Sequence, residues 1–266
     1  MKTQKPLRVV LIGAGNVAEA MAERLQSQGI SIVQVISKRL IKAKQLAKKL
    51  KVNAFTNQLN EIDTNGTVFI IAVSDDALPE VCNFFNQPLF KGKTIFHTAG
   101  SQPASLLKQC PGLTGVIYPL QTFTRGIAQD WSKIPIFIEA NGKSAQNALL
   151  KVARLFNKRV QNINYEKRMH LHLAAVFINN FTNHLLTLAN DVATENGLYF
   201  KDFVPLLNQT VVKAEKIGPV KAQTGPAKRG DKKTIQKHLA LLPKNSYHYK
   251  TYKLLSESIY NHPSYV

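Results

Sequence analysis

Three small residues near the start of the chain have the spacing of a phosphate-binding turn. Gly13, Gly15 and Ala18 follow an apolar run and open an alanine-rich amphipathic stretch, in the order G-x-G-x-x-A. The first glycine of such a motif permits a tight turn, the second lets backbone amides approach a pyrophosphate, and the last small residue allows close packing. The amides of Asn16 and Val17 would face the anion. The motif predicts a dinucleotide site; a turn that serves packing alone is the alternative.

The end of the next expected strand, over residues 32–37, indicates which dinucleotide is bound. NAD-preferring sites usually carry a carboxylate there that accepts the ribose hydroxyl, whereas this chain has Ser37, Lys38 and Arg39. An arginine fork and a lysine charge both attract a 2′-phosphate, and Ser37 can donate to the same group. We therefore expect NADP rather than NAD. The alternative is that Lys38 and Arg39 only begin a basic helix face that runs to Lys51.

Two further strand ends carry side chains that could contact a ligand. Val73 and Ser74 follow an apolar run, and His97 ends another. Ligands bind at the carboxyl ends of the strands in open parallel sheets. We therefore expect Val73 and Ser74 beside the ribose and nicotinamide, and His97 in contact with a substrate or cofactor oxygen.

A long helical pattern over residues 169–197 carries a polar stripe. His172, Asn179 and Asn183 are separated by seven and four residues, so they share one face of an α-helix. Histidine titrates near neutrality and can act as a general acid. His172 is therefore the expected proton donor, and Asn179 is expected to orient the substrate. The alternative is a stripe of polar residues, buried or facing solvent, that binds no ligand.

These residues require a scaffold of alternating strands and helices. Residues 1–163 alternate short apolar runs with amphipathic helical patterns, which predicts an α/β domain of the Rossmann type with a doubly wound parallel sheet. Residues 164–266 contain helical patterns alone, which predicts an all-helical second domain. Expected strands cover 8–12, 32–37, 67–73, 94–97, 115–118 and 135–139, and expected helices cover 17–28, 41–50, 76–85, 144–156, 169–197, 203–217, 231–241 and 245–260.

Composition narrows the class of protein. No apolar run approaches 18 residues, so no membrane span is expected, and the basic N-terminus leads into a glycine turn rather than a cleavage site, which favours a cytoplasmic protein. The two cysteines form neither a disulfide framework nor a metal set, and no metal site is predicted. The net charge of +19 could attract nucleic acid. We expect no nucleic-acid partner, because no recognised module is present and aromatic residues do not interleave the basic runs.

Five motifs together resemble a family of two-domain Rossmann-like proteins whose C-terminal half is known as domain of unknown function 2520. They are GAGNVA at the start, HTAGS at 97–101, YPLQTF at 118–123, HLAAVFINNFTNHL at 172–185 and TGPAKRGD at 224–231. The chain is more distantly similar to pyrroline-5-carboxylate reductase, 6-phosphogluconate dehydrogenase and ketopantoate reductase. The resemblance implies a helical domain like the C-terminal one of 6-phosphogluconate dehydrogenase, which closes over the nicotinamide and often forms a dimer.

One departure from the hydroxyacid dehydrogenases bears on the chemistry. Those relatives use a lysine four residues before an asparagine; with Asn179 as that asparagine, Ala175 stands where the lysine would be. His172 or His97 could substitute for it. The sequence thus predicts an NADP(H)-dependent oxidoreductase that reduces a small, anionic carbonyl or imine compound and forms a homodimer. The alternative is a non-catalytic NADP-binding regulator or partner-binding protein.

Overall fold

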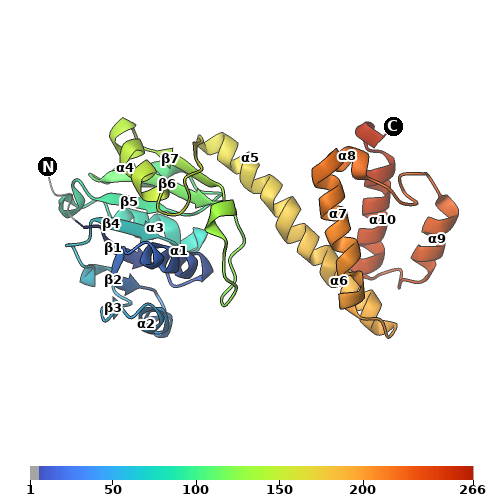
Figure 1. Ribbon diagram of the computed structural model, residues 1–266, viewed down its shortest axis with the longest axis horizontal. Helices are drawn as coiled ribbons and strands as arrows, with labels where there is room; N and C mark the ends of the chain where they lie inside the picture. The colour runs from blue at the N-terminus through green and yellow to red at the C-terminus, as the bar shows by residue number, and fades with distance from the viewer. Residues whose placement is uncertain (1–5, 266) are drawn as a thin grey trace. The chain divides into compact units, whose positions relative to one another are not determined.

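A computed structural model describes residues 6–265 of the chain, which fall into two compact units, one up to Asn179 and one from Asn180 onward (Figure 1). The predicted boundary between residues 163 and 164 lies in the short connection between the last strand and the helix after it. That boundary remains a prediction. The outermost residues of the two predicted domains, 1–5 and 266, lie outside the described residues.

An eight-stranded sheet forms the centre of the first unit, with strand order β3-β2-β1-β4-β5-β6-β7-β8. The chain enters at β1, moves outward through β2 to β3, and returns to β4 on the other side of β1, so the predicted doubly wound arrangement is confirmed. The strands are β1 (Arg8–Ile12), β2 (Ser31–Ile36), β3 (Phe55–Thr56), β4 (Val68–Ile71), β5 (Thr94–His97), β6 (Leu113–Pro119), β7 (Ile136–Ala140) and β8 (Val160–Asn162).

The far edge of the sheet departs from the parallel arrangement that the sequence predicts. β7 pairs with β6 in the antiparallel sense, with Tyr118 opposite Phe137, whereas the other neighbouring strands are parallel. Parallel neighbours need a long crossover, usually a helix. The segment between β6 and β7 contains only the 3₁₀ turn Trp131–Lys133, so the chain reverses direction.

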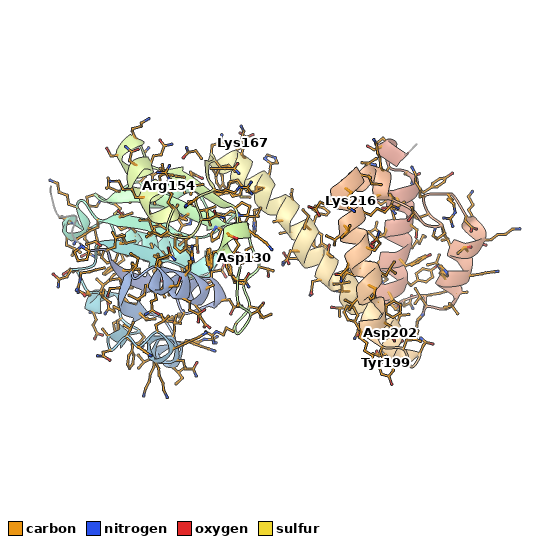
Figure 2. The ribbon with its side chains drawn as sticks, viewed as in Figure 1. Asp130, Arg154, Lys167, Tyr199, Asp202 and Lys216 are labelled. Atoms are coloured by element: carbon orange, nitrogen blue, oxygen red, sulfur yellow. The ribbon has the colours of Figure 1, made fainter. Side chains whose placement is uncertain are left out.

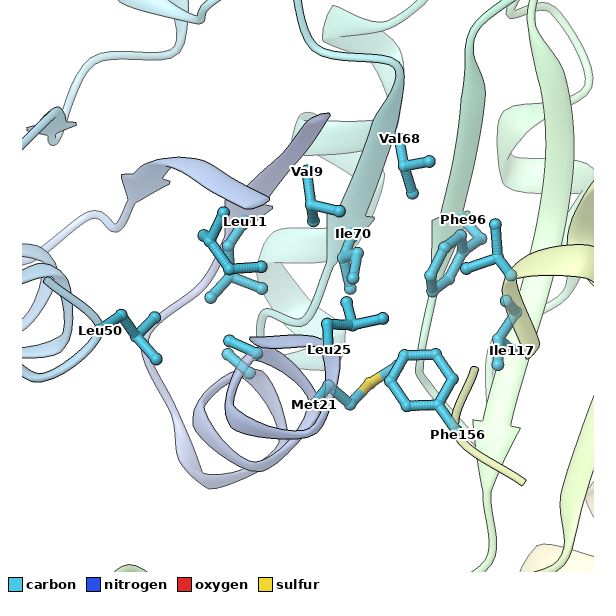
Figure 3. Packing of buried hydrophobic residues seen from close by; sticks show 14 of the residues in the cluster. Val9, Leu11, Met21, Leu25, Leu50, Val68, Ile70, Phe96, Ile117 and Phe156 are labelled. Atoms are coloured by element: carbon cyan, nitrogen blue, oxygen red, sulfur yellow. The ribbon is translucent and has the colours of Figure 1, made fainter. Parts of the chain in front are cut away.

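Helices cover both faces of the sheet because its central strands are apolar on both sides. Val9 and Leu11 pack with α1 (Asn16–Ser27), α2 (Leu40–Lys49) and α4 (Lys143–Ala153) on one face. Figure 3 shows Met21 and Leu25 of α1 against this layer. Val10 and Ile12 face the other side, where α3 (Leu78–Phe84) packs. Short 3₁₀ turns complete this unit at Leu59–Glu61, Asp75–Ala77, Pro88–Phe90 and Ala104–Leu107.

The rest of the described chain is helical, which confirms the predicted class of the second domain. None of its described helices is both long and apolar enough to cross a bilayer. The elements are α5 (Tyr165–Ala175), the π-helical segment η6 (Val176–Phe181), α6 (Thr182–Glu195), η7 (Phe200–Phe203), α7 (Val204–Ile217), α8 (Pro219–Ala222), α9 (Lys232–Ala240), α10 (Tyr247–Tyr260) and η8 (Pro263–Tyr265).

The π-helical segment corrects one expectation. The sequence predicts an uninterrupted α-helix in which His172 and Asn179 share a face, but Asn179 lies inside η6. A π-helix bonds each residue to one five positions away, so its turns hold more residues than α-helical turns. The seven-residue spacing therefore no longer brings Asn179 onto the face of His172. Segments of this kind occur frequently at functional sites.

Candidate functional site

The turn after β1 requires glycine at its first position. Gly13 has φ +118°, and a Cβ atom there would lie 2.0 Å from the carbonyl oxygen of Ala72. Its amide donates to the carbonyl of Ile36 at 2.7 Å. Gly13 therefore joins the ends of three neighbouring strands at the point where the strand order reverses, which is where open α/β sheets bind their ligands.

The second glycine has a different role, because neither its backbone conformation nor a neighbouring protein atom requires a glycine at this position. Gly15 has ordinary extended φ and ψ, and a Cβ atom there would meet no atom within 4 Å. Gly15 is the N-cap of α1, yet no side chain caps the helix, and no described residue accepts from the amides of Asn16 and Val17. Unpaired amides at a helix start attract anions. The open space at Gly15 fits the pyrophosphate of a dinucleotide.

The side chains of Asn16 and Val17 point elsewhere. Asn16 donates through its amide nitrogen to the carbonyl of Phe123 at 2.9 Å, and Val17 packs against the core. Arg125, from the same loop as Phe123, donates to the carbonyl of Ala14 at 2.8 Å. The loop after β6 therefore braces the turn, and Asn16 and Val17 can offer an anion only their backbone amides.

Two exposed cations stand at the end of β2. The Lys38 and Arg39 side chains are exposed and have no hydrogen-bond or ion-pair partner among residues 6–265, and Ser37 beside them is half-buried. Ser37, Lys38 and Arg39 replace the carboxylate that would accept a ribose hydroxyl. The residues present fit a 2′-phosphate, because a planar guanidinium and an ammonium both bind phosphate oxygens.

The loops after β4 and β5 are joined to each other. Val73 is half-buried and Ser74 is exposed, as expected for residues at the mouth of a ligand crevice. The Ser101 hydroxyl, from the loop after β5, donates to the Asp75 carboxylate. Ser74 is therefore held close to the loop that carries the polar residues after His97.

His97 is fully buried, and its ring forms hydrogen bonds with the backbone of the loop after β5. The amide of Ala99 donates to its Nδ1 at 3.3 Å, so Nε2 carries the proton and donates to the carbonyl of Pro103 at 3.2 Å. Burial lowers the pKa of His97 to about 4, so the ring is neutral near pH 7. Direct contact of His97 with a substrate remains a prediction, and the ring is 0% exposed in this structure.

His172 lies against β6 rather than standing alone on its helix. The Tyr118 hydroxyl and Nδ1 of His172 are 3.1 Å apart, and the two rings meet edge to face. A Cβ atom on Gly100 would lie 2.6 Å from the same nitrogen. The glycine thus makes room for the imidazole, and the phenol fixes its orientation. Burial raises the pKa of Tyr118, so the phenol keeps its proton at neutral pH.

Arg168, which sequence reasoning did not select, organises the loop after β5. It follows Lys167 in the first turn of α5 (Figure 2) and is 0% exposed. Its Nη1 donates to the carbonyls of Ala99 and Gly100 at 2.7 and 2.6 Å, and its Nη2 to that of Gln102 at 2.5 Å. Nη2 also pairs with Glu139 at 2.8 Å.

One signal in the sequence could have found Arg168. It stands four residues before His172, so the two lie one above the other on a helix, and Glu139 ends an expected strand. The structure therefore brings His172, Tyr118, Gly100 and Arg168 together around one loop. It brings no contact between Asn179 and this group: Asn179 is exposed.

Titratable groups elsewhere in the described part of the chain do not form a metal site. Within residues 6–265, no three His, Cys, Asp or Glu side chains are placed to hold a metal ion together. Cys82 and Cys110 are both buried, and burial raises the pKa of Cys82 to about 12.

Two protein families match the chain. Residues 8–99 match the family described as NADP oxidoreductase coenzyme F420-dependent. Residues 134–259 match the domain of unknown function DUF2520. A crystal structure from Bacteroides fragilis, named as a candidate NADP oxidoreductase, is 36% identical, with a TM-score of 0.88 over 97% of this chain and 99% of that one. The chain belongs to the DUF2520 family.

Further similarities concern the fold or part of the chain. A pyrroline-5-carboxylate reductase from Coxiella burnetii shares the fold at 16% identity, with a TM-score of 0.56 over 94% of this chain and 90% of that one. Glutamyl-tRNA reductase of Desulfotalea psychrophila is 36% identical over 92 residues, and the match spans only 22% of that enzyme and 31% of this chain. The resemblance to the DUF2520 family is confirmed, and the relationship supports an oxidoreductase with a nicotinamide dinucleotide cofactor.

Proposed function

We propose that this DUF2520 protein is an NADP(H)-dependent oxidoreductase that reduces a small carbonyl or imine compound. The open space at Gly15, beside unpaired helix amides at the reversal point of the sheet, is the observation that carries the proposal. The preference for NADP over NAD rests on Lys38 and Arg39, whose charges have no partner among residues 6–265.

Residues of this chain would divide the work as follows. The amides of Asn16 and Val17 bind the pyrophosphate, and Ser37, Lys38 and Arg39 bind the 2′-phosphate. Val73 and Ser74 lie beside the ribose and nicotinamide. When bound, NADPH supplies the hydride, and the protein supplies position and charge.

The proton is assigned to His172, which has a fixed orientation through Tyr118. Asn179 is exposed and would orient the substrate, and His97 contributes by holding the loop beside His172. Ala175 leaves the helix without the lysine of the hydroxyacid dehydrogenases. The reaction therefore depends on the histidine, or on a substrate that arrives already protonated.

The substrate is proposed to be a small anionic molecule, consistent with the net charge of +19. A cytoplasmic location and the absence of a nucleic-acid partner remain predictions from sequence, as does the domain division at residues 163 and 164. An affinity for random DNA that falls steeply with salt would contradict the predicted absence of a nucleic-acid partner.

A homodimer is proposed from the apolar surface of the second unit. Among the described residues from Asn180 onward, the buried hydrophobic residues are Ala193 and Ala227, whereas Leu241 is 80% and Leu254 66% exposed. Figure 2 shows Tyr199 in the connection between α6 and α7, and its side chain is 66% exposed. Apolar surface of this extent marks an interaction site. Sedimentation at micromolar concentration should give about twice the single-chain mass of 29.6 kDa; a single-chain mass would contradict the dimer.

The experiment that tests catalysis is a screen for NADPH oxidation. A panel of ketoacids, aldehydes and cyclic imines is offered to the wild type and to His172→Ala. We expect one class to be reduced by the wild type and His172→Ala to lose most of that rate, since a positioned general acid contributes roughly 10²–10⁴-fold. An equal rate in both proteins would remove His172 from the mechanism.

The second candidate function is a non-catalytic NADP-binding regulator. The observation that favours it is Ala175, which leaves the helix without the usual acid. Tight NADPH binding without hydride transfer to any member of the panel would support the regulator and contradict the enzyme.

A further inference from the structure

Two backbone amides after β5 are turned in a common direction by the buried arginine. The carbonyl oxygens of Ala99 and Gly100 both accept from Nη1 of Arg168. In a planar trans peptide the N–H points opposite to the C=O of the same unit, and the chain has no cis peptide among its described residues. The N–H groups of Gly100 and Ser101 therefore both point away from the guanidinium.

These two amides are left without an acceptor. No residue within 6–265 accepts from the nitrogen of Gly100 or Ser101, although Gly100 is a buried residue. Buried amides are nearly always paired, so an unpaired one calls for a partner that is not part of the chain. The third carbonyl held by Arg168, that of Gln102, precedes Pro103, which has no N–H to display.

Their surroundings are those of a reaction site rather than of a packing defect. A Cβ atom on Gly100 would lie 2.6 Å from the ring of His172, the assigned proton donor, and 3.1 Å from the ring of Tyr118, so Gly100 lies beside both side chains. The Ser101 hydroxyl is already engaged with Asp75, so the backbone amide of Ser101, not its side chain, is the donor that remains.

We propose that the Gly100 and Ser101 amides form an oxygen-binding site that receives a carbonyl or carboxylate oxygen of the substrate. Successive amides that point the same way form a concave site for a negative or partly negative oxygen. Arg168 and Glu139 set the peptide orientation and stay behind the loop. The catalytic role of this site rests on the proposed function. Its ability to bind an oxygen follows from the peptide geometry alone.

A carbonyl oxygen bound there would be ready for reduction. Hydride addition at the carbonyl carbon breaks the C–O π bond and places its electron pair on the oxygen. The oxygen then takes a proton from the imidazolium form of His172, which is left as neutral imidazole, so the carbonyl is reduced to an alcohol and the dinucleotide is oxidised. Fixed donors aimed at an oxygen that gains charge stabilise this transition state. A protonated imine nitrogen finds no acceptor in these two amides, so the site favours a carbonyl compound.

The sequence permits a selective test, because it contains two Ala–Gly pairs, Ala14–Gly15 and Ala99–Gly100. Full-length protein labelled with ¹³C-carbonyl alanine and ¹⁵N-glycine shows one carbonyl-filtered amide signal for each. One signal reports the phosphate turn, and the other reports the proposed oxygen site. NADP⁺ is added first, then acetate or acetamide, with methylammonium chloride as the control for ionic strength.

We expect NADP⁺ to shift the Gly15 signal, and acetate to shift the Gly100 signal in a saturable manner. Acetamide distinguishes the sources of the oxygen: a shift with both probes indicates a carbonyl site, and a shift with acetate alone indicates a carboxylate site. A Gly100 signal that neither probe moves, or that methylammonium moves equally, overturns the proposal. An unmoved Gly15 signal contradicts the cofactor assignment instead, so the two failures are distinguishable.

Matched variants separate the amide from the side chain. Ser101→Ala keeps the N–H and loses the hydroxyl, whereas Ser101→Pro loses both. We expect the acetate response of Gly100 to persist in Ser101→Ala and to weaken severalfold in Ser101→Pro. Arg168→Lys provides an independent arm if the proline variant does not fold: its Gly15 signal should still respond to NADP⁺ while the Gly100 response to acetate is lost. Full acetate responses in Arg168→Lys would contradict the role of the guanidinium.

Discussion

The Tyr118 hydroxyl lies 3.1 Å from Nδ1 of His172 and joins strand β6 to helix α5. The two groups share one hydrogen bond, in which the phenol donates to a bare Nδ1 or accepts from a protonated Nδ1. Tyr118 thus constrains the protonation of Nδ1 in the histidine assigned as proton donor.

Removal of the Tyr118 hydroxyl should allow His172 to populate both neutral tautomers. In Tyr118→Phe we expect ¹⁵N spectra of His172 to change from one dominant tautomer to a mixture, with a loss of stability of about 1 kcal/mol for one hydrogen bond. Tyr249→Phe, in α10, is the control. Unchanged His172 nitrogen shifts in Tyr118→Phe would show that the phenol does not set the tautomer.

Alanine substitutions at the two glycines of the phosphate turn should affect different properties. Gly13→Ala should mainly reduce stability, and Gly15→Ala should mainly reduce NADPH affinity. Gly13→Ala should lose stability by about 1–3 kcal/mol from its backbone conformation alone, with further cost from Ala72. Gly15→Ala should lose less than about 1 kcal/mol, since a Cβ there meets no protein atom, yet should weaken NADPH binding roughly tenfold, about 1.4 kcal/mol. Thermal unfolding and calorimetry check the pair. Wild-type affinity in Gly15→Ala would mean that the open space is not occupied by the cofactor.

His97 should make the protein sensitive to mild acid. Its pKa is lowered from 6.5 to about 4 in the folded state, so the unfolded chain binds the proton more readily. The stability that this ring contributes is present above about pH 6.5 and is lost as the pH falls toward 4, by about 3 kcal/mol at most. Denaturant titrations across this range should show a shallower loss in His97→Gln. An identical pH slope in both proteins would contradict the burial of a neutral ring.

Arg168 and Glu139 should depend on each other. Arg168→Met leaves a nearly buried carboxylate and three carbonyls without their donor, and should cost about 3–5 kcal/mol. The double variant Arg168→Met, Glu139→Leu should recover part of this loss, because it removes the uncompensated charge. Additive losses in a double-mutant cycle would show that the pair is not coupled.

The Rossmann arrangement could be predicted from the sequence because the features that indicate it are local. Apolar strands, a glycine turn with φ +118° at Gly13 and helix periodicity are each visible within a few residues. The reversed β7 was not visible, because strand direction depends on what connects β6 to β7. The π-helical segment was equally hidden, since it displaces Asn179 without changing the apolar pattern.

The candidate site was predictable where a residue acts through its backbone and less so where it acts through burial. Gly15 follows from its motif. Arg168 has only the signal of its four-residue spacing from His172, because a charged residue in the first turn of a helix is ordinarily exposed. Its burial depends on Glu139, far away in the sequence, and on the loop carbonyls. His97 was selected for its type, but its ring is enclosed by neighbours far apart in the sequence.

NADP(H) binding at the phosphate turn underlies every other role proposed for this chain, and calorimetric titration tests it most directly. NADPH and NADH are titrated into the wild type, Arg39→Ala and Lys44→Ala, a control that removes an exposed charge from the same region. We predict that NADPH binds the wild type more tightly than NADH, and that Arg39→Ala alone loses about 1.5–3 kcal/mol of NADPH affinity, the worth of a charged hydrogen bond. Equal binding of NADPH and NADH, or no binding of either, would contradict the account.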